Sequence, residues 1–151
     1  MRYWRPFTKD VVRDVKHWGA TDVLLLPLYP QFSTTTTASS LRAWRRASEL
    51  PSATICCHFA STQFTDAHVD AIMQAWRAGG SPPKPRVLFS AHGLPQRVVD
   101  KGDPYQWQVE QSAEAIRVKL PADWETRICY QSRVGPLKWL GPSTKEEIER
   151  A

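Results

Sequence analysis

The chain has 151 residues, of which 42% are hydrophobic, and its formal net charge is +5. This length and apolar content suffice for one ordinary domain or two small ones, and they exclude a disordered chain. No apolar run approaches the roughly 20 residues that cross a bilayer, and residues 1–6 lack the apolar stretch of a signal peptide. We therefore expect a cytoplasmic protein.

The positive charge is concentrated in the first third of the chain. Residues 1–50 hold eight Lys or Arg against four Asp or Glu, giving +4, so the remaining residues contribute only +1. A solvated helix face explains such a patch more often than a bound anion does. We expect no nucleic-acid partner, whereas peripheral contact of this patch with an anionic surface of the inner membrane stays open.

Three cysteines, Cys56, Cys57 and Cys129, form no C-x-x-C pair, and their odd number argues against a secreted disulfide framework. Neighbouring residues of a strand point to opposite faces, so Cys56 and Cys57 cannot easily bind one metal ion. We expect buried, reduced thiols that pack in the core.

Residues 1–80 show helical and strand patterns in alternation. The predicted elements are a helix with Val11, Val12, Val15 and Trp18 on one face, a buried strand over 22–28, a helix that begins at Ser39 or Ser40, a strand over 53–58, and a helix with Val69, Ile72, Met73 and Trp76 on one face.

Residues 79–85 contain two glycines and three prolines and break any regular element. We therefore place a domain boundary here, between a first domain at residues 1–80 and a second at residues 81–151.

The second domain continues the alternation. The predicted elements are a strand over 86–90, a helix capped by Asp103 with Pro104 in its first turn, Gln106 completing a capping box and Tyr105, Val109, Ala113, Ile116 and Leu120 on its core face, a strand over 126–130, and a final helix with a Ser143–Glu146 capping box. This order predicts an α/β fold of parallel sheets covered by helices.

Distinctive side chains follow the predicted strands, and binding groups of parallel sheets gather at such carboxyl ends. The first strand leads into residues 29–37, the next two end at His58 and His92, and the last leads into residues 131–135. An imidazole suits both metals and protons near neutral pH, although many such histidines only bond a neighbouring loop.

Two further segments leave alternatives open. The hydroxyl-rich residues 34–37 either satisfy backbone donors at a helix start or contact a substrate. Trp139 either covers the core or stacks on a flat aromatic ligand. Phosphate-loop, dinucleotide-binding and nucleophile-elbow motifs are absent from the sequence, so nucleotide binding and serine hydrolysis have no local support.

Five motifs, in order along the whole chain, resemble the ferrochelatase family, whose members insert ferrous iron into a porphyrin. The matching residues are Met1-Arg2-Tyr3, Leu28-Tyr29-Pro30-Gln31-Phe32-Ser33 with Thr36-Thr37 and Ser39-Ser40-Leu41, Phe89-Ser90-Ala91-His92-Gly93-Leu94-Pro95, Gly102-Asp103-Pro104-Tyr105, and Tyr130-Gln131-Ser132-Arg133-Val134-Gly135-Pro136 through Trp139-Leu140-Gly141-Pro142.

The resemblance implies parts of two doubly wound, Rossmann-like domains that flank a porphyrin cleft. It implies that His92 is the catalytic histidine, as an Fe²⁺ ligand or as the base that takes pyrrole protons. The porphyrin-binding residues that it implies are Arg2, Tyr3, Tyr29, Ser33, Thr35 and Trp139. The expected reaction converts Fe²⁺ and protoporphyrin IX into protohaem with release of two protons.

The resemblance also implies missing parts. The family's N-terminal portion and its later motif of a histidine and glutamates are absent, so we expect a central fragment whose partners include the missing flanking segments. We expect no [2Fe–2S] cluster, because Thr34 stands where some members have a cysteine. The alternatives are a catalytically incomplete porphyrin- or protein-binding fragment, and a chelatase for another metal or tetrapyrrole.

Overall fold

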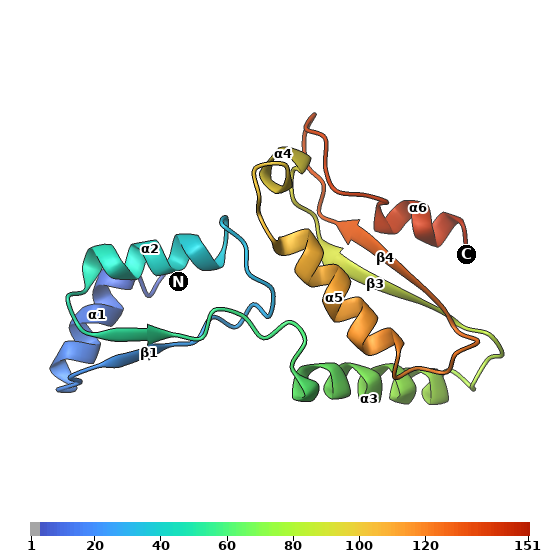
Figure 1. The fold of residues 1–151 in the computed structure, drawn as a ribbon, viewed down its shortest axis with the longest axis horizontal. Coiled ribbons are helices and arrows are strands. Elements are labelled where there is room, and N and C mark those ends of the chain that lie inside the picture. The colour runs from blue at the N-terminus through green and yellow to red at the C-terminus, as the bar shows by residue number, and fades with distance from the viewer. Residues whose placement is uncertain (1–3) are drawn as a thin grey trace. The chain divides into compact units, whose positions relative to one another are not determined.

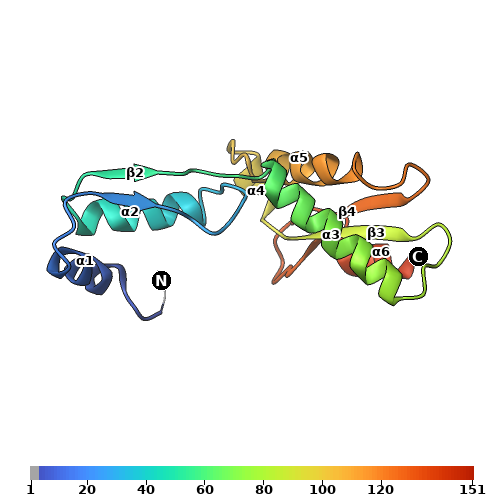
Figure 2. The same cartoon turned by 90° about the horizontal axis from the view of Figure 1, so that it is seen from below.

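The computed structural model describes residues 4–151, so the predictions for Arg2 and Tyr3 lie outside the described residues. The chain divides into two compact units, Met1–His58 and Phe59–Ala151 (Figures 1 and 2). Each unit contains a two-stranded parallel sheet with helices, which confirms the predicted α/β class.

The first unit alternates helix and strand as predicted, although its strands are short. Its elements are α1 (Thr8–His17), β1 (Val23–Leu25), α2 (Thr37–Ala47) and β2 (Ser52–Thr54). Strand β1 pairs with β2 from Val23 opposite Ser52 to Leu25 opposite Thr54. Helices α1 and α2 pack against each other.

Two burial predictions for this unit are wrong. The predicted buried strand over 22–28 is regular over three residues only, and Leu24, Leu26 and Leu28 are exposed, Leu28 by 84%. A strand is buried on both faces only where a layer covers each face, and the described residues supply none over these leucines. Trp18 follows the last residue of α1 and is 85% exposed, because it lies beyond the helical face that buries Val12.

The cysteine prediction is correct for one residue and wrong for another. Cys129 is buried in a strand of the second unit, whereas Cys56 is exposed and Cys57 is half-buried. Strand β2 ends at Thr54, so the two neighbouring cysteines follow the strand instead of belonging to it.

The second unit holds the longer sheet. Its elements are α3 (Thr62–Ala78), β3 (Arg86–His92), α4 (Gln96–Val99), α5 (Tyr105–Arg117), β4 (Glu125–Gln131) and α6 (Thr144–Glu149). Strands β3 and β4 pair in parallel from Arg86 opposite Glu125 to His92 opposite Gln131. Helix α5 connects the strands, and α5 and α6 lie on opposite sides of the sheet (Figures 1 and 2).

Helix α3 belongs to the same compact unit as the sheet that follows it. The Lys119 ammonium donates to the Thr65 hydroxyl at 2.7 Å, and the rings of Trp76 and Trp124 lie 5.2 Å apart. The segment rich in proline and glycine therefore connects α3 to β3 within this unit. The domain limits predicted at residues 80 and 81 concern the domains of a complete family member and stay a prediction.

The core of this unit lies between α5 and the sheet, as the spacing of apolar residues predicts. Its buried residues include Leu94, Val109, Ala113, Ile116, Leu120, Cys129, Tyr130 and Leu140. At the start of α5 the Asp103 carboxylate accepts the Tyr105 N–H at 3.0 Å, as its predicted capping role requires. The predicted completion of a capping box by Gln106 is wrong, because its amide donates to Glu110 at 3.0 Å. The Ser143–Glu146 capping box of α6 is confirmed.

Candidate active site at the carboxyl end of strand β3

His92 is the last residue of β3 and lies opposite Gln131 on β4. Its side chain is exposed and has no hydrogen-bond or ion-pair partner within residues 4–151. An exposed imidazole without a protein partner is available to a metal ion or to a proton.

The backbone around His92 is held on both sides. The Tyr105 hydroxyl donates to the His92 carbonyl at 2.9 Å, and the Gly93 N–H donates to the Gln131 carbonyl at 2.8 Å. Burial raises the pKa of Tyr105. The hydroxyl therefore stays protonated, and remains a donor, at neutral and moderately alkaline pH.

Gly93 permits a close approach between the loop after β3 and the loop after β4. A Cβ at this position would lie 2.8 Å from the Gln131 carbonyl oxygen, which is closer than real Cβ contacts come. It would also lie 3.4 Å from the Trp139 ring and 3.6 Å from Arg133 Cγ. Trp139 and Arg133 are thus neighbours of the residue that follows His92.

Backbone bonds join the two loops beyond Gly93. The Leu140 N–H donates to the Leu94 carbonyl at 3.0 Å, and the Gln96 N–H donates to the Lys138 carbonyl at 2.8 Å. The Trp139 indole N–H donates to the Val134 carbonyl at 3.1 Å, which fixes the half-buried ring. The structure therefore brings together His92 and Trp139, two of the residues implied by the resemblance, while their roles stay predictions.

Three other predicted site residues belong to the first unit. Tyr29 is 62% exposed, Ser33 is 1% exposed, and the Ser33 hydroxyl accepts the Thr35 N–H at 3.1 Å. The hydroxyls of Ser33 and Thr35 lie 2.8 Å apart, immediately before α2. The loop leads directly into α2 as expected, but its N-cap residue Thr36 makes no side-chain cap hydrogen bond, so the helix-start interpretation is supported only by position. Porphyrin contact by these residues stays a prediction.

The described residues do not complete a metal site at His92. Within residues 4–151, no group of three or more His, Cys, Asp or Glu side chains is placed to hold a metal ion. Among the helices that the structure describes, none combines the length and the apolar character needed to cross a membrane.

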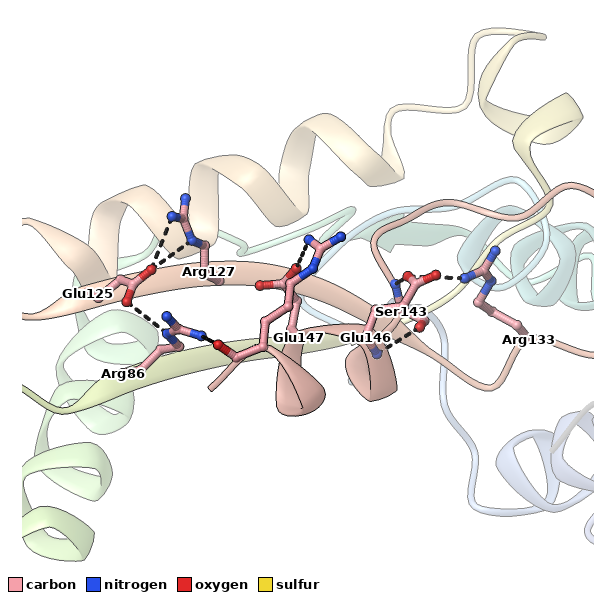
Figure 3. A network of polar contacts seen from close by, with 8 residues as sticks. Arg86, Glu125, Arg127, Arg133, Ser143, Glu146 and Glu147 are labelled. Atoms are coloured by element: carbon pink, nitrogen blue, oxygen red, sulfur yellow. Dashed lines mark hydrogen bonds and ion pairs between the residues drawn. The ribbon is translucent and has the colours of Figure 1, made fainter.

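The opposite end of the same sheet holds a charged cavity of about 630 Å³ that sequence reasoning missed. Glu125 accepts from Arg86 at 2.8 Å and from Arg127 at 3.1 Å, and Arg86 also donates to the Arg150 carbonyl at 2.9 Å (Figure 3). The hydrogen bond from Arg86 lowers the pKa of Glu125. No local pattern in the sequence indicates this cluster, because Arg86 and Glu125 are 39 positions apart and meet only through the pairing of β3 with β4.

A second ion pair lies at the start of α6, where Arg133 Nη1 is 3.8 Å from Glu146 Oε2 (Figure 3). Glu146 also completes the α6 capping box. The buried Glu147 of the same helix accepts from Arg150 at 2.8 Å. Because its charged groups pair with one another, we interpret this network as structural support for the sheet.

The fold and the site together define a parallel α/β protein with an exposed histidine at the carboxyl end of a strand. The family model described as Ferrochelatase matches residues 1–151. The chain belongs to the ferrochelatase family.

Curated relatives named ferrochelatase agree with this assignment. A protein of Hyphomonas neptunium is 59% identical over 150 residues, which cover 99% of this chain and 42% of the relative. Proteins of Phenylobacterium zucineum and Caulobacter vibrioides are 52% and 51% identical over 153 residues, covering 100% of this chain and 45% and 44% of the relatives. The chain thus spans less than half the length of these relatives.

Proposed function

We propose that this chain supplies the catalytic histidine and part of the porphyrin pocket of a ferrochelatase that converts Fe²⁺ and protoporphyrin IX into protohaem. The observation that carries the proposal is the exposed imidazole of His92, whose backbone is fixed by Tyr105 and Gly93 beside Trp139. The reaction requires the remaining length of the relatives, which this chain does not span.

The chemistry of insertion suits a neutral imidazole. Each Fe²⁺ that enters the macrocycle replaces two pyrrole protons, and a fixed base close to the pyrrole nitrogens lowers the entropic cost of removing them. The same imidazole nitrogen could instead hold Fe²⁺ before transfer. In both roles the hydrogen-bonded backbone of His92 matters, because it fixes the point from which the exposed imidazole extends.

The fixed ring of Trp139 favours a flat aromatic substrate at this site. Its indole N–H is bound to the Val134 carbonyl, so the ring keeps one orientation next to the loop that carries His92. A fixed aromatic face stacks on a planar macrocycle with little loss of side-chain entropy. Tyr29, Ser33 and Thr35 are proposed as further porphyrin contacts from the first unit.

The proposal extends to the substrates, to cofactors and to the location of the protein. Porphyrin and ferrous iron are the substrates, and carboxylates outside this chain complete the iron and proton path, since the described residues place no cluster at His92. The site requires no [2Fe–2S] cluster. We propose a cytoplasmic location, and peripheral contact of the basic residues in the first third of the chain with an anionic inner membrane stays an open alternative.

The test is a chimera in which this chain replaces the matching residues of the Hyphomonas neptunium relative. We expect His92→Ala to lower the rate of Fe²⁺ insertion at least 100-fold, on the order of the 10²–10⁴ that acid–base groups contribute. His17→Ala, at the exposed end of α1, is the matched control and should keep the rate. A His92→Ala chimera with the normal rate would refute the assignment.

A second candidate function is a porphyrin- or protein-binding piece without turnover. The family assignment does not favour it over the first proposal. Titration of the porphyrin Soret band with the 151-residue chain, followed by an insertion assay, separates the two. Binding without turnover supports this candidate, and turnover by the chain alone excludes it.

Rates with Fe²⁺, Co²⁺ and Zn²⁺ in the chimera test a different metal preference.

A further inference from the structure

Helix α2 of the first unit lines a cavity of about 570 Å³ that also involves α1 and residues 25–29. Neither His92 nor Trp139 is among the residues that line it. Positions three, four and seven residues apart lie on one face of a helix. The α2 residues of the cavity lining that share such a face are Thr37, Ser40, Leu41 and Trp44.

Two polar atoms on this face have no hydrogen-bond partner within residues 4–151. They are the hydroxyl oxygen of Thr37 and the indole nitrogen of Trp44. Thr37 is 1% exposed and Trp44 is 7% exposed, so solvent does not satisfy them either. The neighbouring Ser39 hydroxyl, in contrast, donates to the carbonyls of Thr35 and Thr36. A buried donor without a partner is costly, so an acceptor that reaches it binds with more than the usual gain.

The other groups around the cavity define the chemistry of a ligand. Val11, Leu25 and Leu41 supply apolar surface, and none of the described residues that line the cavity is Asp, Glu, Lys, Arg or His. A charged ligand would therefore be desolvated there without a partner of opposite charge. The indole N–H of Trp44 only donates, the Thr37 hydroxyl can donate, and a carbonyl oxygen accepts.

We propose that this cavity binds small, uncharged, mostly apolar carbonyl compounds, whose oxygens accept from the Trp44 indole N–H and the Thr37 hydroxyl. The two residues are seven positions apart, or about 10 Å along the helix axis, so a ligand with a carbonyl at each end suits them best. Tyr29 and Thr35 also line the cavity and are proposed porphyrin contacts, whereas the two donors are not. Binding at these donors is thus independent of the proposed iron insertion.

The probe is 1,4-diacetylbenzene, a rigid, uncharged ring with a carbonyl at each end and no reactivity toward thiols. The ¹⁵N-labelled chain is titrated with it, and the indole N–H signals of its seven tryptophans are followed by NMR. The Trp44 signal, identified by its absence in Trp44→Phe, should move downfield because a hydrogen bond to a carbonyl deshields the proton. The signal of Trp18, which is 85% exposed and does not line the cavity, should stay in place.

Substitutions decide whether the two donors hold the ligand. Trp44→Phe and Thr37→Val should each weaken binding by about 3- to 10-fold, the change that loss of one net hydrogen bond produces. Trp18→Phe is the matched control and should bind like the unchanged chain. Thr37→Val removes a hydroxyl that has no partner, so the melting temperature without ligand should not fall. The hydrocarbon 1,4-diethylbenzene, which has a similar shape and no oxygen, should not move the Trp44 signal downfield.

Four results would overturn the proposal. They are a Trp44 signal that stays in place at saturation, variants of both donors that bind like the unchanged chain, the same downfield shift with 1,4-diethylbenzene, and that shift with protoporphyrin IX, which would assign the cavity to the porphyrin. Binding is measured without iron, so failure of the proposed iron insertion leaves this test unaffected. Conversely, a failure to bind the probe would not bear on the role of His92.

Discussion

The sheets of the two units differ in length and in what covers them. Strands β1 and β2 are three residues long and leave Leu24, Leu26 and Leu28 exposed. Strands β3 and β4 are seven residues long, have helices on both sides, and bury Cys129 and Tyr130 almost completely. Similar apolar strand patterns thus lead to different burial, because burial depends on the layers available. The candidate histidine lies on the better supported sheet.

The largest expected effect contrasts a buried leucine with an exposed one. Leu140 is 2% exposed and packs in the core with Leu94 and Tyr130, so Leu140→Ala should lower the free energy of unfolding by about 3 kcal/mol. Leu28→Ala should change it by less than about 0.5 kcal/mol. Urea unfolding followed by circular dichroism measures both. Equal losses would contradict the contrast between the two sheets.

The next effect concerns the close approach at the candidate site. Gly93→Ala places a Cβ 2.8 Å from the Gln131 carbonyl oxygen and should cost about 2 kcal/mol, because the two loops must separate. Gly79→Ala, where the added atom makes only ordinary contacts of 3.4 Å or more, should have little effect. Thermal unfolding compares the two variants, and equal melting temperatures would show that the loops adjust freely.

A smaller effect is expected from the hydroxyl that holds His92. Tyr105→Phe removes the donor to the His92 carbonyl and should cost about 1 kcal/mol, the usual net value of one hydrogen bond. In the chimera, the same variant should lower the insertion rate less than His92→Ala does, because the imidazole is retained. A Tyr105→Phe chimera as slow as His92→Ala would instead give the hydroxyl a direct role.

The smallest effect concerns the charged end of the sheet. The bond from Arg86 lowers the pKa of Glu125, so the stability from this carboxylate is present above its unfolded pKa near 4.5 and is lost as the pH falls through the lower folded value. Glu125→Gln should therefore flatten the acid side of the melting-temperature profile. Glu49→Gln, in the exposed part of the first unit, is the control. Because the pair is partly exposed, added salt should reduce the difference.

The second unit is the part of the fold that sequence patterns predict best. The spacing of Val109, Ala113 and Ile116 identifies the buried face of α5, and the strand over 126–130 corresponds to β4. The spacing of apolar residues predicts the buried face of each element there, because each element packs against a partner within the same unit. Contacts between residues that are far apart in the sequence, such as Arg86 and Glu125, leave no local pattern and were not predicted.

The first unit shows where such patterns fail. Leucines at residues 24–28 read as buried, yet burial requires a covering layer that a pattern does not contain. Cys56 was predicted inside a strand, and the strand ends two residues earlier. At the candidate site, the strand-end position of His92 followed from sequence. The contact between the loop after β3 and the loop after β4 could not be predicted, because it depends on backbone hydrogen bonds between residues 93–96 and 138–140.

The pairing of β3 with β4 also has a kinetic consequence. Arg86 and Glu125 are 39 positions apart, and closing a flexible loop of this length costs on the order of 3 kcal/mol of chain entropy. Parallel strands meet only after the connecting helix has formed and folded back, which makes their pairing slow relative to helix formation. We expect His92 to reach its place beside Gln131 in a late folding step, after α5 has formed.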